Sequence, residues 1–229
     1  MSGARDWRYE TKYVLKADEP LLFYEWLINY PDLRPDHPSR RVNSIYFDTP
    51  ELDCAQANLD GISRREKFRL RWYGSEGPGQ KILFEIKSRR DRMGTKISHP
   101  IAWPGGDPAK IDGATLASVS TEIDHLAFMS HSFGSLQPTL AVSYERAYYV
   151  TTMGVRMTVD THLAFQDCNI DIPNELLASQ ANESTIVEFK FARNAKEQAS
   201  HLMAGLPFSA NRSSKYLLGL SLLGKALYI

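Results

Sequence analysis

Large apolar residues alternate with charged residues in many short segments of the chain, the pattern of β-strands that bury one face. Between residues 67 and 71, for example, the basic side chains of Lys67, Arg69 and Arg71 are separated by single apolar residues. This alternation predicts strands over residues 7–15, 42–48, 65–73, 82–87, 96–103, 140–150, 155–165 and 186–191.

Helical periodicity predicts helices over residues 19–29, 51–59, 113–130, 195–203 and 214–227. We expect Asp18 to cap the first helix and Gly61 to end the second. Pro31, Pro35 and Pro38 predict a loop before the second strand. Because strands and helices do not alternate regularly, we expect an α+β fold of antiparallel strands, formed by one domain over residues 1–229.

The composition is that of a globular protein. Hydrophobic residues make up 43% of the 229 residues and charged residues 24%, which excludes a largely disordered chain. The 27 basic residues balance 27 acidic ones, which argues against bulk electrostatic binding of nucleic acid or an anionic membrane. Cys54 and Cys168 lack metal-ligand spacing, so we expect a reducing compartment. The most apolar segment, residues 216–229, is shorter than a span of about 20 residues, and no signal peptide is visible, so we expect a cytoplasmic protein.

The predicted strands carry an excess of positive charge, although the whole chain is neutral. Their polar faces hold ten basic residues and four acidic ones, namely Arg8, Lys12, Lys67, Arg69, Arg71, Lys87, Arg89, Arg146, Arg156 and Lys190 against Glu10, Glu85, Asp160 and Glu188. For any single strand, a solvated outer face explains such charges. The combination favours a concave surface that holds a polyanion, because Arg and Lys bind phosphate oxygens and a few acids suit a divalent cation.

Motifs of other functions are weak or missing. The sequence has no Walker loop, no dinucleotide fingerprint and no G-x-S-x-G elbow. Its six histidines lack metal-ligand spacing, so we interpret each as a surface or core residue. We interpret the aromatic residues as core or strand-pairing residues rather than a base-stacking platform, including Tyr46, Phe47, Tyr148 and Tyr149.

Eight segments resemble, in the same order, the catalytic domain of the vacuolar transporter chaperone (VTC) polyphosphate polymerases. They are RYETKYVL at 8–15, SIYFDTPELD at 44–53, KFRLRWYG at 67–74, FEIKSR at 84–89, YERAYY at 144–149, VRMTVD at 155–160, VEFKF at 187–191 and SSKYLLG at 213–219. The resemblance implies the triphosphate tunnel metalloenzyme (CYTH-like) fold, in which antiparallel strands close into a tunnel lined by charged residues, with helices outside. The wider superfamily has E-x-E-x-K in its first strand, whereas this chain has Arg8-x-Glu10-x-Lys12. That departure favours a more basic tunnel with fewer metal ligands.

The resemblance also implies roles for particular residues. By motif, the catalytic residues would be Lys12, Arg69, Arg71, Lys87, Arg146 and Tyr144. Arg156, Lys190, Ser214 and Lys215 would hold oxygens of a nucleotide or polyphosphate, and Glu188, with Glu10, would hold a metal ion. Ser214 and Lys215 are also the first residues of a predicted helix, where free backbone amides favour phosphate.

The activity implied by the resemblance is an ATP-dependent polyphosphate polymerase. It would transfer the γ-phosphate of ATP to a growing polyphosphate chain with the help of Mg²⁺ or Mn²⁺. Two alternatives remain: hydrolysis of inorganic or nucleoside triphosphate in the same tunnel, and a non-catalytic polyphosphate-binding module. ATP and polyphosphate or triphosphate are the expected partners, without nucleic acid and without membrane insertion. A complex with membrane or regulatory subunits stays open.

Overall fold

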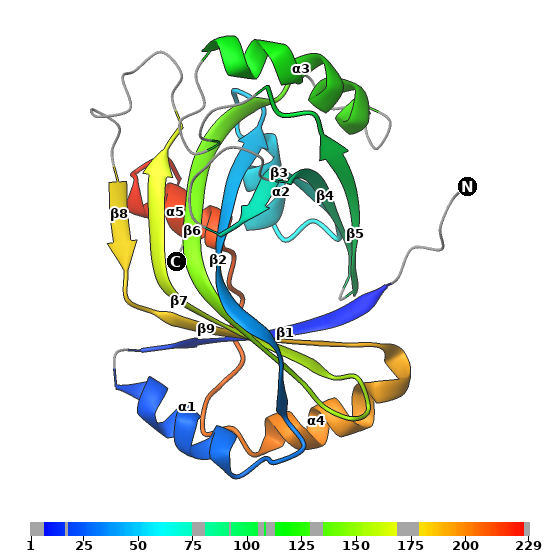
Figure 1. Ribbon diagram of the computed structural model, residues 1–229, viewed down its shortest axis with the longest axis vertical. Coiled ribbons are helices and arrows are strands. Elements are labelled where there is room, and N and C mark those ends of the chain that lie inside the picture. The colour runs from blue at the N-terminus through cyan, green and yellow to red at the C-terminus, as the bar shows by residue number, and fades with distance from the viewer. Residues whose placement is uncertain are drawn as a thin grey trace.

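In the computed structural model, nine strands form one sheet that curves into a ring (Figure 1). The structure describes residues 7–16, 18–74, 81–91, 93–104, 108, 113–128, 135–168 and 179–226. The strands are β1 (Arg8–Leu15), β2 (Arg34–Asp48), β3 (Arg64–Tyr73), β4 (Ile82–Arg90), β5 (Met93–Ile101), β6 (Gln137–Val150), β7 (Arg156–Asp167), β8 (Ser179–Asn182) and β9 (Thr185–Phe191). The helices are α1 (Glu19–Ile28), α2 (Asp53–Leu59), α3 (Gly113–Phe128), α4 (Lys196–Ala204) and α5 (Lys215–Leu222), with a short 3-10 turn at Arg193–Ala195.

The strand order is β6-β2-β3-β4-β5-β1-β9-β7-β8, and every pairing is antiparallel. An additional pairing between β6 and β7 closes eight of these strands into the ring, and β8 extends the sheet beyond β7. The shortest strand pairing in the ring is the one between β1 and β5, which consists of Arg8↔Gly94 and Tyr9↔Met93. The predicted antiparallel α+β fold is therefore confirmed.

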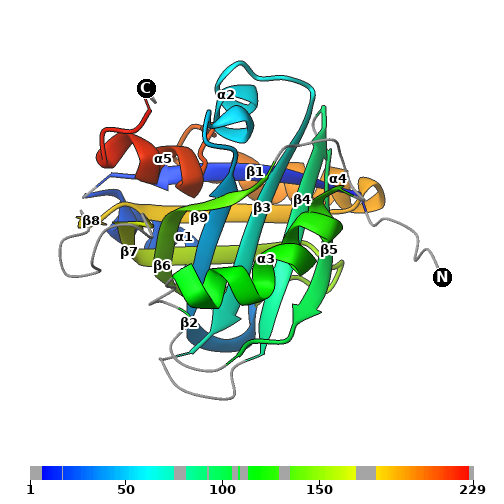
Figure 2. The ribbon, with the colours of Figure 1, turned by 90° about the horizontal axis from the view of Figure 1, so that it is seen from above.

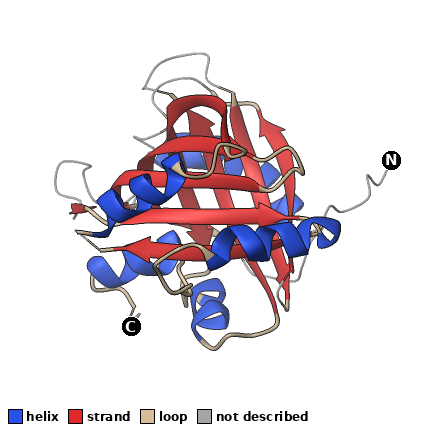
Figure 3. Ribbon diagram, turned by 90° about the horizontal axis from the view of Figure 1, so that it is seen from below, coloured by secondary structure: helices blue, strands red, loops and turns tan. Residues whose placement is uncertain are grey.

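Two hydrophobic clusters lie outside the ring, because the apolar side of each alternating strand faces a helix. Helix α3 packs its Val119 and Ile123 on the outer face of β3 and β4, where Phe68 and Phe84 are fully buried. On the opposite side α1 and α4 cover β1, β7 and β9 (Figures 1 and 3). The second cluster includes Tyr13, Leu15, Phe23, Trp26, Val155, Met157, Val159, Val187, Phe189 and Phe191, with Ala199 and Leu202 of α4.

A third hydrophobic cluster lies on the face of the strands opposite to the one that carries the first two clusters. There α5 and α2 pack against β2, β6 and β7. Helix α5 comes very close to the sheet at Gly219. A Cβ added there would lie 2.5 Å from Phe165 Cδ1 and 2.6 Å from Leu140 Cδ2. The missing side chain of Gly219 is therefore what lets this helix approach the strands.

Some predicted elements need correction. The loop predicted from Pro35 and Pro38 is wrong, because β2 already begins at Arg34. Both prolines lie where the pairing of β2 with β6 shifts register, at Pro35/His37 and His37/Arg40, and such irregularities tolerate a residue without an N–H. Strand β8 was not predicted.

The predicted helix ends had mixed outcomes. Asp18 makes no side-chain capping bond, and its backbone is already helical. The backbone N–H of Lys16 instead donates to Glu19 Oε2 at 2.7 Å. Gly61 has a φ of +68°, directly after α2, as expected of a glycine that ends a helix. Among the described residues, no helix is long and apolar enough to cross a membrane.

Candidate functional site

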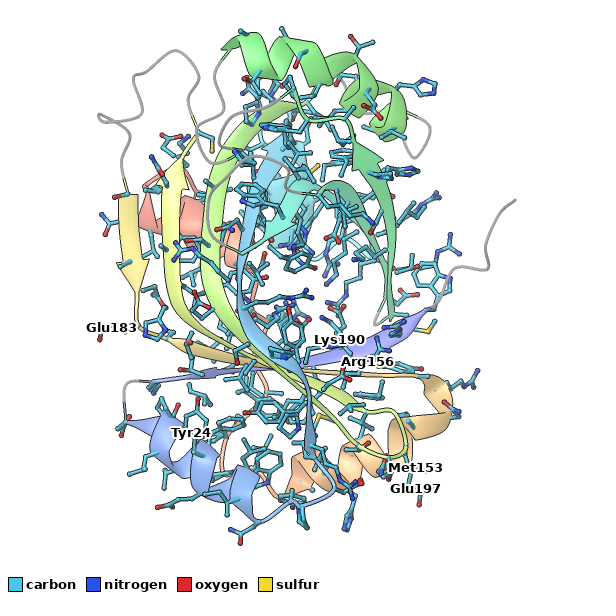
Figure 4. The ribbon with its side chains drawn as sticks, viewed as in Figure 1. Tyr24, Met153, Arg156, Glu183, Lys190 and Glu197 are labelled. Carbon is cyan, nitrogen blue, oxygen red and sulfur yellow. The ribbon has the colours of Figure 1, made fainter. Side chains whose placement is uncertain are left out.

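The charged sides of the ring strands face one another across the interior. We call this side, which carries Lys12, Arg69 and Arg146, the inner face. It is opposite the outer face that packs on α1, α3 and α4. Lys190 on β9 and Arg156 on β7 are register partners there and lie side by side near the middle of the molecule (Figure 4). Seen from above, the strands that carry these residues cross the strands β2 to β5 (Figure 2).

The first charged group on the inner face is built around Glu85, whose side chain is fully buried. Arg69 donates to Glu85 Oε2 from Nε at 2.9 Å and from Nη2 at 2.7 Å. Arg71 Nη1 lies 3.7 Å from the same oxygen, and Lys96 bonds to Oε1. Burial alone would raise the pKa of Glu85, but Arg69, Arg71 and Lys96 outweigh it and hold the pKa below its ordinary value.

The second group is built around Asp160, which is also fully buried. Arg146 binds both carboxylate oxygens, with Nε at 2.6 Å from Oδ1 and Nη2 at 2.7 Å from Oδ2. Lys215, the first residue of α5, donates to Oδ2 at 2.5 Å. Burial alone would raise the pKa of Asp160, but Arg146 and Lys215 outweigh it and lower the pKa to about 2.

Tyr144 connects these two groups. Its hydroxyl accepts a bond from Arg71 Nη2 at 2.9 Å. Its ring lies under Lys215, 4.7 Å from Nζ to the ring centroid, and 5.1 Å from the guanidinium carbon of Arg146. Arg71 is therefore held in place by a phenol and by Glu85 together.

The third group joins β1 and β9 around Glu188. Lys190 Nζ lies 3.2 Å from Glu188 Oε2, and Lys12 Nζ lies 3.8 Å from Oε1. On β1, Glu10 pairs with Lys87 of β4 at 2.8 Å. Burial alone would raise the pKa of Glu188, but Lys190 and Lys12 outweigh it and hold the pKa well below its ordinary value. Burial lowers the pKa of Lys190 to about 8, although Glu188 opposes this shift.

Three lysines of the inner face are direct cross-strand partners. Lys67 on β3 is in register with Lys87 on β4, which is in register with Lys96 on β5. We call these three residues the lysine row. Like charges placed directly opposite one another destabilise a sheet. Lys87 and Lys96 each have a carboxylate partner, Glu10 and Glu85.

Lys67 has no carboxylate within salt-bridge distance among the described residues. Its Nζ donates instead to the neutral hydroxyl of Ser214 at 2.7 Å. Burial, together with the charges of Lys12 and Lys87, lowers the pKa of Lys67 well below its ordinary value. Ser214 also accepts a bond from the backbone N–H of Leu217, as the N-cap of α5. Its own hydroxyl hydrogen therefore remains available to an acceptor on the inner face.

Helix α5 is also anchored by the buried carboxylate of Asp48, the last residue of β2. Asp48 accepts bonds from the backbone N–H groups of Thr49, Cys54 and Ala55, and from the Tyr216 hydroxyl at 2.6 Å. The ring of Tyr216 stacks on that of Tyr46, with centroids 5.0 Å apart. Arg69 in turn donates to the Tyr46 hydroxyl at 3.1 Å. The position of α5, and with it Ser214 and Lys215, is thus tied to the arginines of the inner face.

The inner face also offers a place for a divalent cation. Glu188 Oε1 is buried and has no hydrogen-bond partner, and Glu10 lies on the neighbouring strand β1. Within the described part of the chain, no three His, Cys, Asp or Glu residues gather as a metal site. Mg²⁺ is often held by only one or two carboxylates together with substrate phosphates. The donors present fit a cation shared between Glu188 and a bound phosphate chain.

The structure brings most residues of the sequence-based site together. Lys12, Arg69, Arg71, Lys87, Tyr144, Arg146, Lys190, Ser214 and Lys215 all contact another charged or polar group of the inner face. Arg156 lies at the beginning of β7 and is exposed. Their roles toward a ligand remain proposals.

Sequence reasoning left Lys67, Lys96, Glu85 and Asp160 out of the site. The charge pattern suggested Glu85 and Asp160, with Glu10 and Glu188, as acids that suit a divalent cation. In the structure, arginines and lysines pair with the oxygens of Glu85 and Asp160. The alternating pattern had placed Lys67, Glu85 and Asp160 on the polar faces. It could not show which strand lies next to which.

The comparisons with known proteins agree with this geometry. The family model for the VTC domain matches residues 7–224. No curated protein matches the sequence. Among solved structures, the bh2851 protein of Bacillus halodurans, described as a candidate adenylate cyclase, has a TM-score of 0.54 and 14% identity, covering 93% of this chain and 96% of its own. The PH1819 protein of Pyrococcus horikoshii OT3 has a TM-score of 0.54 and 12% identity, covering 94% of this chain and 99% of its own. These structural likenesses show a shared triphosphate tunnel fold, and the family match shows that this chain belongs to the VTC domain family.

Proposed function

We propose that the protein is an ATP-dependent polyphosphate polymerase that works on the inner face of the ring. The observation that carries this proposal is the lysine row, in which Lys67, Lys87 and Lys96 stand directly opposite one another on three adjacent strands. Such a row costs stability in the free protein. A chain of phosphates is the kind of ligand that would remove this repulsion along its length.

The residues around the row supply the other requirements of phosphoryl transfer, which depends mainly on positioning and charge neutralisation. Arg69, Arg71 and Arg146 are held in fixed orientations by carboxylates and Tyr144, so they can bind phosphate oxygens without first being ordered. Glu188, with Glu10, would hold Mg²⁺ or Mn²⁺. When bound, such an ion would neutralise charge on the phosphates.

In the proposed reaction, an oxygen of the terminal phosphate of the growing chain attacks the γ-phosphorus of ATP. The bond between the γ-phosphorus and its bridge to the β-phosphate breaks, and ADP leaves with that bridging oxygen. The arginines stabilise the charge that develops on the transferred group. Truncating one of them should cost on the order of 2–4 kcal/mol of transition-state stabilisation.

Product analysis tests this proposal. Purified protein is incubated with γ-labelled ATP and Mn²⁺ or Mg²⁺, and the products are resolved on a gel. A ladder of labelled polyphosphate with release of ADP supports the polymerase. Release of free phosphate without a ladder would mean that the inner face hydrolyses ATP instead of extending a polyphosphate chain. No turnover, with thermal stabilisation by triphosphate, would leave a binding module.

Two variants sharpen this experiment. Lys87→Ala removes the central member of the lysine row, and we expect it to abolish the ladder or reduce it severely. Lys225→Met is the control, because Lys225 pairs with Asp167 away from the lysine row. Full activity of Lys87→Ala would show that Lys87 is not a catalytic residue.

A further inference from the structure

A cluster of aromatic rings around one arginine lies at the edge of the inner face. The guanidinium carbon of Arg40 is 3.9 Å from the ring centroid of Tyr73 and 5.1 Å from that of Tyr148. Arg40 Nε also donates to the Tyr148 hydroxyl at 3.0 Å. We call Arg40, Tyr73 and Tyr148 the arginine–tyrosine cluster. The ring of His37 meets Tyr148 edge-on, 5.7 Å between centroids.

Strand alternation places this cluster on the inner face. Tyr73 lies two residues after Arg71 on β3, and Tyr148 lies two residues after Arg146 on β6. Arg40 on β2 lies between them, because β2 pairs with both β3 and β6. The next residue, Arg41, points to the opposite side and bonds to Ser143 Oγ at 2.9 Å.

The cluster also lies at the end of β6 away from α5. Helix α5 approaches β6 near Leu140, whereas Tyr148 is next to the turn that joins β6 to β7. Two residues along a strand span about 7 Å, so Tyr148 is one side-chain step from the Arg146 group. That step leads from the interior of the ring toward its edge.

The chemistry of the cluster differs from that of the rest of the inner face. Arg69, Arg71 and Arg146 lie against carboxylates, but Arg40 contacts only phenol rings and one phenol hydroxyl among the described residues. Arg40 is exposed, and both tyrosines are half-buried. Planar guanidinium and phenol groups offer stacking surfaces to another flat ring, and they do so without requiring one particular base.

We propose that the arginine–tyrosine cluster binds the nucleobase of a nucleoside triphosphate whose phosphates lie on the inner face. The proposal rests on the proposed function of the inner face as a phosphate site. It adds a reason why the protein would prefer a nucleotide to inorganic triphosphate. It also revises our sequence-based interpretation of Tyr148 as a core or strand-pairing residue.

Binding measurements on the full chain test this inference. The dissociation constants of ATP and of inorganic triphosphate are measured by calorimetry at one Mg²⁺ concentration. Loss of a stacking partner weakens binding by roughly tenfold or more. For Tyr148→Leu, we therefore expect ATP to bind about tenfold more weakly and inorganic triphosphate to bind as in the wild type.

Two further variants separate stacking from a structural role. Tyr148→Phe keeps the ring and loses the hydroxyl, so it should keep most of the affinity for ATP. Tyr149→Leu removes the next tyrosine along β6, which packs with the outer cluster, and should leave both affinities unchanged. Circular dichroism checks that each variant is folded.

Several outcomes would overturn the inference. They are an equal loss of affinity for both ligands in Tyr148→Leu, no loss of affinity for either, and a loss of affinity for inorganic triphosphate alone. If the wild type binds inorganic triphosphate and any of these occurs, the nucleobase site fails while the phosphate site stands. If the wild type binds neither ligand, the proposed function fails, and the nucleobase site fails with it.

Discussion

At the scale of single residues, the inner face is a set of charges that compensate one another incompletely. Arg69↔Glu85, Arg146↔Asp160 and Lys12↔Glu188 are direct cross-strand partners of opposite charge. Opposite charges in this position stabilise a sheet. The lysine row is an exception, as are the like-charged partners Arg156↔Lys190 and Arg40↔Arg146. Within the described part of the chain, Lys67 is the member of the row that has no carboxylate partner. The site thus combines a stable framework of ion pairs with cations that remain available to a ligand.

Lys67→Met tests this incomplete compensation. A hydrogen bond to a charged group contributes roughly 1.5–3 kcal/mol, so we expect the variant to bind inorganic triphosphate about tenfold more weakly or worse. The folded protein should lose little stability, because the change removes repulsion from Lys12 and Lys87. Calorimetric titration and urea unfolding measure the two effects. Unchanged affinity would mean that Lys67 does not touch the ligand.

Asp160 gives a prediction for acid. Its folded pKa of about 2 lies below its ordinary value, so it stabilises the protein above the ordinary value, and this contribution is lost as pH falls toward 2. The contribution is on the order of 2 kcal/mol. The free energy of unfolding should therefore fall more steeply between pH 4 and pH 2 in the wild type than in Asp160→Asn. Parallel curves for the two proteins would contradict the ion pair with Arg146.

At the scale of elements, α5 is the part that links the hydrophobic core to the phosphate site. Its apolar side packs against β6 and β7. Its N-cap Ser214 and its first residue Lys215 contact charged residues of the inner face. Asp48 and Tyr216 hold the helix in this position. The segment SIYFDTPELD therefore contributes to the site through the position of a distant helix.

Tyr216→Phe tests this link. The variant removes one bond to the buried Asp48 carboxylate, and we expect it to lower the free energy of unfolding by about 1.5–3 kcal/mol. We also expect weaker binding of inorganic triphosphate, because Ser214 and Lys215 would be held less firmly. Ser221→Ala on the same helix is the control. If Tyr216→Phe loses stability and keeps its full affinity, the anchor has no influence on the site.

The elements also show what could be predicted from the sequence. Alternation was sufficient for β1, β3, β4, β6, β7 and β9, because each has one apolar and one charged side. It failed for the beginning of β2, where Pro35 and Pro38 are tolerated only by irregular pairing with a strand some 110 residues away. It also failed for β8, a four-residue strand with three exposed residues.

At the scale of the whole molecule, the ring brings together residues that are far apart in the sequence. Lys12, Lys67 and Ser214 meet because β1, β3 and the segment before α5 converge on the inner face. The sequence pattern predicted a basic concave surface, and the family resemblance supplied its shape. Neither could predict that Glu85 and Asp160 form ion pairs with arginines, because strand order and register are known only from the closed sheet.

The most direct test of the central claim is a calorimetric titration of the wild-type protein with inorganic triphosphate. We expect saturable binding that weakens as salt is added, because the attraction is electrostatic. We expect binding to be lost or strongly reduced in Lys87→Ala and kept in Lys225→Met. Absence of saturable binding by the wild type, or equal binding by Lys87→Ala, would contradict a phosphate site on the inner face.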